Sequence, residues 1–169
     1  MMKRLSLLSI LILCISSCSV KTPEPAAYND SLAVQQIGIT EKANSLHDAF
    51  AGYVKAEMEI RRNDLELQLE KAEKAIKRTG KYENDSRLLE AASQFIEGFK
   101  KINREEYDEV IRILSKPDSI YTDSDEARLS ILYKTIDDQS NKLISTFILA
   151  QQEFAQSHEF TLKNDSSAQ

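Results

Sequence analysis

Residues 129–154, LSILYKTIDDQSNKLISTFILAQQEF, form the longest regular apolar pattern in the chain. Apolar residues recur along it every three or four positions, and the one position of this spacing that holds a polar residue is Ser140. An α-helix has 3.6 residues per turn, so this spacing predicts a long helix with one apolar face. Such a face is stable in water when it packs against other helices. The series consists of Leu129, Tyr133, Ile136, Leu143, Phe147, Ala150 and Phe154.

Three shorter apolar series with the same spacing precede this one and predict three more helices. Asn29 or Asp30 can cap the first of them, and Gln36 interrupts its apolar face. Gly80 ends the second predicted helix, and the third begins a few residues later. The three series are Leu32, Ile39, Ala43, Leu46, Phe50 and Tyr53; Met58, Leu65, Leu69, Ala72 and Ile76; and Leu88, Ala92, Phe95, Phe99 and Ile102.

The third predicted helix contains an irregularity. Its next apolar position should be 106, which holds Glu106, and the pattern resumes one residue late at Tyr107. A skip of one residue predicts either a π-bulge or a break that a capping box from Asn103 to Glu106 restarts. Pro117 then ends this helix, because proline cannot continue one.

We therefore expect an all-α fold in which residues 28–160 form one antiparallel four-helix bundle, with helices running up-down-up-down. The third helix should carry a kink or π-bulge near residues 102–107. The composition agrees, since the chain has only four glycines and three prolines and is rich in Leu, Ile, Ala, Glu and Lys. Two stacked helical hairpins would produce the same pattern and are the alternative architecture.

Residues 1–17 have the features of a secretory signal peptide. Lys3 and Arg4 precede an apolar region of 11 residues, whereas a membrane span takes about 20. The region ends in Ile15-Ser-Ser-Cys18, which resembles the lipobox of bacterial lipoproteins. The resemblance implies that the signal peptidase cuts before Cys18. It also implies that the Cys18 thiol carries a diacylglyceryl group with fatty-acyl chains such as palmitate.

A lipidated Cys18 would anchor the chain to a membrane, since each buried methylene contributes roughly 0.8 kcal/mol. Cys14 fits the lipobox less well because it lies inside the apolar region and follows the bulky Leu13. An ordinary exported thiol at Cys18 is the alternative. In the lipidated form the mature chain has no cysteine left for a disulfide, a metal site or a nucleophile.

The sequence also indicates where the anchored domain would lie. Residues 18–27 contain Pro23 and Pro25 and predict an extended, polyproline-like tether. Residues 161–169 are polar and predict a disordered tail. In lipoproteins an Asp after the lipidated cysteine favours the inner membrane; Ser19 stands there, so we expect the outer membrane. Whether the domain faces the periplasm or the cell surface stays open.

The charge of the chain disfavours nucleic acid as a partner. The sequence has 22 basic and 27 acidic residues, and cleavage removes Lys3 and Arg4, which leaves 20 against 27 and a formal charge of −7. A surface of this sign repels phosphate backbones and anionic lipid headgroups. The lipid anchor, rather than a basic patch, is therefore expected to hold the domain at the membrane.

Residue patterns for catalysis or cofactor binding are absent from the sequence. A di-iron site in a bundle needs two Glu-x-x-His motifs, but Asn44 and Ala155 stand three residues before His47 and His158. Gly-rich phosphate loops and the Gly-x-Ser-x-Gly motif are also missing. We therefore expect a protein that is not an enzyme and that uses no metal or cofactor.

Two functional hypotheses are left. The first is an interaction or scaffold module that contacts another envelope protein or cell-wall material through a helix face. The second is a binder of a small apolar or amphipathic ligand, held among aromatic residues of the bundle core. Aromatic residues at helical spacing more often fill a core than line a cavity, which favours the first hypothesis.

Three short motifs resemble an uncharacterised family of bacterial helical surface lipoproteins, with a likeness that spans roughly residues 28–162. The motifs are Asn103-Arg-Glu-Glu-Tyr107, Leu114-Ser-Lys-Pro117 and Gln152-Glu-Phe-Ala155. They form helix and turn boundaries, so the resemblance implies a helical fold and an envelope location but supplies no activity and no site residues.

One group of residues is a candidate binding site. Arg62 and Glu106 both interrupt apolar faces, and folding the chain at its turns places position 62 beside the irregularity of the third helix. The same folding brings Tyr53, Tyr107 and Tyr133 to that level. A buried Arg62–Glu106 pair bonded to tyrosine would be tolerated, whereas either charge buried alone would cost several kcal/mol. The alternative is that both side chains extend to solvent along their apolar stems.

Overall fold

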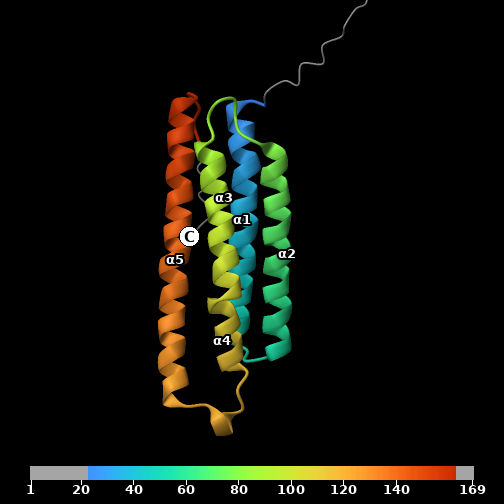
Figure 1. The fold of residues 1–169 in the computed structure, drawn as a ribbon, viewed down its shortest axis with the longest axis vertical. Helices are drawn as coiled ribbons and strands as arrows, with labels where there is room; N and C mark the ends of the chain where they lie inside the picture. The colour runs from blue at the N-terminus through green and yellow to red at the C-terminus, as the bar shows by residue number, and fades with distance from the viewer. Residues whose placement is uncertain (1–22, 163–169) are drawn as a thin grey trace, which may run out of the picture.

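The computed structural model describes residues 23–162, and the chain forms a four-column helical bundle over this range (Figure 1). The predicted signal peptide, the predicted lipidation site Cys18 and the last seven residues lie outside the described residues. The helices run up-down-up-down, as the sequence predicts, with α3 and α4 forming one column. The elements are α1 (Pro25–Phe50), α2 (Lys55–Thr79), α3 (Arg87–Arg104), α4 (Glu106–Leu114), the 3-10 turn η1 (Asp118–Ile120) and α5 (Asp123–Ser157).

The first helix starts earlier than the sequence pattern indicates. Pro25 is its first residue, so positions 25–27 of the predicted tether are helical, and neither Asn29 nor Asp30 acts as the cap. Proline suits a first turn because its φ is preset and its missing N–H would have no helical partner there. Tyr28 fixes this turn in place, since its hydroxyl donates to the carbonyl of Gly80 at 2.9 Å.

The apolar faces of α1, α2 and α3 are buried at the predicted positions, with one exception. Tyr53 is 69% exposed because α1 ends at Phe50, which leaves Tyr53 in the turn to α2 with a φ of 52°. Aromatic rings fill the middle of the core. The centroid of the Phe95 ring lies 4.8 Å from that of Phe99 and 5.9 Å from that of Phe147. On α5 the pattern omitted two buried residues, Leu132 and Ala155.

The phase slip in the third column is a break at one residue, Glu105, with φ −102° and ψ −66°. Neither a π-bulge nor the predicted capping box forms there, because Glu105 occupies the cap position and makes no side-chain cap bond. The backbone bonds from Glu105 N to Lys101 O (3.0 Å) and from Glu109 N to Glu105 O (3.2 Å) keep α3 and α4 nearly in line. As a result both Glu106 and Tyr107 are buried.

A capping box determines where α5 begins. Thr122 Oγ1 accepts a hydrogen bond from the Asp125 N–H (3.3 Å), and the Asp125 carboxylate accepts one from the Thr122 N–H (3.1 Å). These bonds satisfy two amide groups that have no partner within the helix. Lys116 Nζ holds the same carboxylate at 2.6 Å, which joins the end of the third column to the start of α5.

None of the helices between residues 23 and 162 is both long enough and apolar enough to span a membrane.

Candidate functional site

Arg62 lies at the predicted level of the bundle but binds a different partner. Its Nε donates to the backbone carbonyl of Asn103 at 3.3 Å, and its Nη1 lies 2.7 Å from the Asp108 carboxylate. The Arg62 side chain is partly exposed, so this ion pair lies at the surface between α2 and α4. Arg62 therefore stabilises the broken end of α3, whose last carbonyls lack helical partners.

Glu106 faces α5 instead of α2, so the predicted Arg62–Glu106 pair does not form. Its Oε1 accepts a hydrogen bond from Gln139 Nε2 at 3.0 Å, while its Oε2 is buried without a hydrogen-bond partner. The reason is helix geometry: Glu106 and Asp108 are two residues apart and point about 200° apart around α4. The residue that reaches Arg62 is therefore Asp108, which the apolar pattern did not single out.

Two of the three predicted tyrosines meet in the same layer of the bundle. Tyr107 is buried and Tyr133 is half-buried, and their rings lie 5.9 and 6.1 Å from the Phe50 ring. His47 completes the group, with its ring 5.8 Å from Tyr133. Burial, with Asp137 and Glu106 nearby, raises the pKa of Tyr107 to about 12. Tyr53 is exposed in the turn after α1, and Arg62 binds Asn103 and Asp108 at the surface instead. The five-residue layer predicted from the sequence is therefore wrong.

A groove of about 200 Å³ lies between α1 and α5 beside this aromatic group. We name it the α1–α5 groove. It exists because α1 packs mainly on α2 and α5 packs mainly on α3, which leaves α1 and α5 apart in their middle. The walls come from α1 and α5, and Phe99 and Tyr107 form the floor. Its lining is Thr40, Ala43, Asn44, His47, Phe99, Tyr107, Ile136, Asp137, Ser140, Asn141 and Ile144.

Two polar residues in the apolar series mark the position of this groove in the sequence. Gln36 and Ser140 are the polar interruptions of the α1 and α5 apolar series, and both are half-buried. Ser140 lines the groove, and Gln36 donates a hydrogen bond from Nε2 to Thr40 Oγ1 at 3.1 Å, next to it. Polar residues at core positions on two neighbouring helices therefore indicated where those helices separate.

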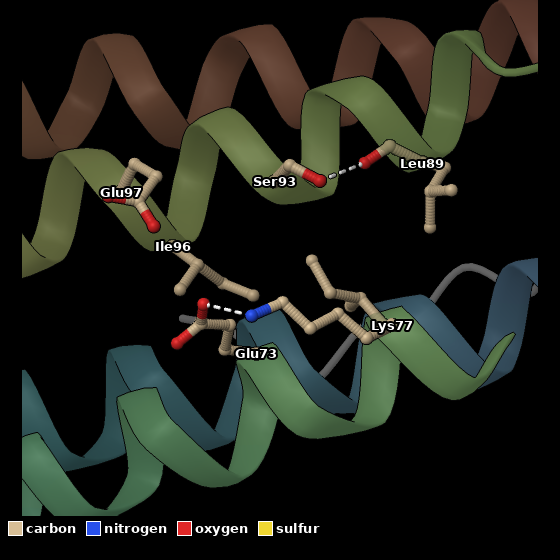
Figure 2. A pocket seen from close by; sticks show the side chains of 7 residues that line it. Glu73, Lys77, Leu89, Ser93, Ile96 and Glu97 are labelled. Carbon is tan, nitrogen blue, oxygen red and sulfur yellow. Dashed lines mark hydrogen bonds and ion pairs between the residues drawn. The ribbon is translucent and has the colours of Figure 1, made fainter. Parts of the chain in front are cut away.

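A second crevice, of about 190 Å³, lies between α2 and α3 (Figure 2). Its charged groups are paired with one another. Glu73 accepts from Lys100 Nζ (2.7 Å) and from Lys77 Nζ (2.6 Å), and these bonds lower the pKa of Glu73 to about 2. Ser93 donates to the carbonyl of Leu89 at 2.9 Å, as the figure also shows. The crevice thus serves to join α2 and α3.

A third pocket, of about 240 Å³, lies between α3 and α5 and is mainly apolar. Gly98 permits the close approach of the two helices here, since a Cβ at this position would lie 2.5 Å from the Leu143 methyl groups. Lys101 and Lys142 stand at its edge. The combination of an apolar surface and two ammonium groups is suited to an amphipathic anion.

The histidines do not assemble a metal site within the described part of the chain. His47 lies in the α1–α5 groove, and His158 packs on Phe154 with its Nε2 3.6 Å from Asp85. No group of three or more His, Cys, Asp or Glu residues between positions 23 and 162 has a geometry that would hold a metal ion.

Comparison with known proteins identifies no relative of this chain. No family model, curated protein or solved structure matches it.

Proposed function

We propose that the protein is a lipid-anchored module of a bacterial cell envelope that binds another envelope component through a helical surface and has no catalytic activity. The α1–α5 groove is the observation that carries the proposal. Its floor and walls mix aromatic, aliphatic and hydrogen-bonding groups, which is the composition of a recognition surface. The aromatic core beneath is closely packed, which favours binding at the surface over binding inside the bundle.

The anchor rests on the lipobox-like Ile15-Ser-Ser-Cys18 and is tested separately. Cells that express the chain are grown with a labelled fatty acid, and the label is followed on the protein. We expect Cys18→Ala to abolish labelling and Cys14→Ala to leave it unchanged. Labelling that survives Cys18→Ala would rule out this anchor.

Binding is tested by photo-crosslinking in intact cells. A photoreactive amino acid is placed at Asn44 or Asn141, both exposed on the α1–α5 groove, and at Glu59 on α2 as the control. We expect discrete crosslinked species from the two groove positions and none from Glu59. The same pattern from all three positions would indicate nonspecific contact and would count against the proposal.

A second candidate function is favoured by the pocket between α3 and α5. Lys101 and Lys142 beside an apolar surface suit a small amphipathic anion, such as a fatty-acid carboxylate. Isothermal titration with decanoate tests it. The test compares the unsubstituted chain with the double variant Lys101→Gln, Lys142→Gln. Loss of decanoate binding in the double variant would support this function. Unchanged decanoate binding would exclude the pocket as the binding site.

A further inference from the structure

We propose that the α1–α5 groove receives a basic amphipathic helix from a partner protein. The inference rests on the proposed binding function and specifies the chemistry of the partner.

The groove is short. Its lining runs from Thr40 to His47 on α1 and from Ile136 to Ile144 on α5, which is about 11 to 12 Å at 1.5 Å per residue. The rings of His47 and Tyr133 meet at one end of it. Further along α1, Gln151 Nε2 donates to Asn29 Oδ1 at 3.1 Å and joins the two helices. A helical segment of about three turns covers the lined length, so an 18-residue helix is long enough.

The edges of the groove carry exposed isoleucines. Ile37 precedes Thr40 by three residues and Asn44 by seven, and Ile148 follows Ile144 by four, so both lie on the groove side of their helices. Each is 43% exposed. Together with the half-buried Ile144 they form an apolar strip along the open side. An amphipathic helix covers such a strip with residues at i, i+3, i+4 and i+7.

The charge beside the strip is negative. Glu41, Asp48 and Asp137 are exposed along the groove and make no ion pair within residues 23–162. On α2, by contrast, acidic residues are paired with basic ones four positions away, as in Glu57–Arg61 and Glu70–Lys74. On α5, Lys134 is bound by Asp138, and Lys142 lines the α3–α5 pocket. Unpaired carboxylates around an apolar strip attract lysine and arginine of a partner.

The same charge argues against a second copy of this chain as the occupant. A two-fold dimer through this face would place the acidic edges of one groove against those of the other, because an isologous interface pairs the same patch on both subunits. Like charges at close range oppose that arrangement. The partner is therefore a different, basic protein segment.

The binding test uses the full chain as purified from cells, in phosphatidylcholine nanodiscs, which carry no net charge. The probe is a fluorescent 18-residue peptide of leucine and lysine with its leucines on one helical face. A matched peptide has glutamate in place of lysine. Fluorescence anisotropy reports binding, and empty nanodiscs give the background. The measurement does not depend on lipidation, so a failed anchor and a failed groove are distinguishable.

The decisive variants are two pairs of exposed apolar residues. Ile37→Lys with Ile148→Lys changes the groove, whereas Ile131→Lys with Leu149→Lys changes the face of α5 away from the groove, where these residues are 56% and 55% exposed. We expect saturable binding of the basic peptide, a loss of about tenfold or more in affinity in the groove pair, and a change of less than about twofold in the control pair. Asp137→Asn with Glu41→Gln should weaken binding and flatten its salt dependence.

Several outcomes would overturn the proposal. The acidic peptide could bind as tightly as the basic one, or both variant pairs could lose the same affinity for the basic peptide. The basic peptide could also show no saturable binding up to about 1 mM. Finally, analytical ultracentrifugation could show a dimer that the groove substitutions disrupt. Groove-specific crosslinks in cells without peptide binding would reject the basic helix as the occupant while leaving the proposed binding function in place.

Discussion

Glu106 is the most unusual side chain in the third column, because one carboxylate oxygen is hydrogen bonded and the other is buried without a partner. The phase slip at Tyr107 singled out this position, and the sequence left two alternatives for its charge, a buried pair with Arg62 or extension to solvent. It could not identify the partner, since the side of α4 that Glu106 faces depends on the dihedral angles of Glu105. A difference of one residue in phase rotates every following side chain by about 100°.

We expect Glu106→Gln to stabilise the fold by about 1 kcal/mol. The introduced amide can still accept the bond from Gln139, and because it is neutral it removes a charged oxygen that is desolvated and unpaired. Urea denaturation measures the change, with the exposed Glu105→Gln as the control expected to have little effect. A destabilised Glu106→Gln variant would mean that the charged oxygen has a stabilising partner.

Phe99 and Phe147 are fully buried, and we expect each Phe→Ala substitution to cost about 3–5 kcal/mol of unfolding free energy. The cost arises because removing the ring leaves a cavity that the neighbouring rings cannot fill. Leu143→Ala should cost less, since Leu143 is half-buried at the α3–α5 pocket. Lys74→Ala, on the solvent face of α2, should change stability by less than about 0.5 kcal/mol. Equal small losses at all four positions would contradict the observed packing.

At the scale of elements, the α2–α3 loop and the end of α5 are joined by a cluster of paired groups. Asp85 accepts bonds from Arg87 Nε (3.0 Å) and Nη2 (2.6 Å), and Arg87 also reaches Ser157 at 3.3 Å. Tyr82 packs on Phe154 with a centroid distance of 5.4 Å. Helical periodicity does not predict these contacts, because they depend on how loop residues meet in space rather than on spacing along a helix.

The Asp85 cluster predicts a loss of stability in acid. Hydrogen bonds from Arg87, the largest cause, lower the pKa of Asp85 to about 2 from its ordinary value of 3.8. A carboxyl with a lower pKa in the folded state contributes stability above pH 3.8 and loses it as the pH falls towards about 2. Because Arg87 is exposed, screening leaves a contribution of about 1 kcal/mol. Urea denaturation at several pH values tests this. We expect Asp85→Asn to lower the free energy of unfolding at pH 7. Near pH 2 the variant and the unsubstituted chain should have the same free energy of unfolding.

If Asp85→Asn lowers the free energy of unfolding by the same amount from pH 7 to pH 2, the effect of the substitution comes from packing and not from charge. Glu73→Gln serves as the comparison, since its pKa is also lowered to about 2, first by the bond from Lys100 and then by the bond from Lys77. Its stability difference should disappear over the same interval, because the same linkage applies to any carboxyl with a lowered pKa.

At the scale of the molecule, four apolar series and their boundaries were sufficient to predict the bundle and its order. Each series buries one face, and short connections leave neighbouring helices antiparallel. The α1–α5 groove was not predicted, because helical spacing shows which faces are apolar but not how far apart two helices lie. Only the polar interruptions Gln36 and Ser140 indicated the gap, and a single polar residue in a series is too common to identify a site.

The anchor and the bundle together predict an orientation at the membrane. Pro25 is seven positions after Cys18, and an extended chain spans at most about 3.6 Å per residue. In the proposed anchored form the start of α1 would therefore lie within about 25 Å of the lipid. The α2–α3 loop lies at this same end of the bundle, and η1 lies at the opposite end (Figure 1). The 26 residues of α1 span about 39 Å. A net negative charge disfavours a bundle lying flat on an anionic surface.

Energy transfer to labelled lipid headgroups measures this orientation. Since lipidation would consume the Cys18 thiol and cleavage would remove Cys14, Lys81→Cys and Ser119→Cys each supply the single dye site, beside the α2–α3 loop and in η1. We expect strong transfer from position 81 and weak transfer from position 119 in vesicles that contain anionic lipid. Equal transfer would mean that the bundle lies flat. Loss of transfer from both positions after Cys18→Ala would attribute the membrane contact to the anchor, because the acidic bundle has no other strong attraction to the surface.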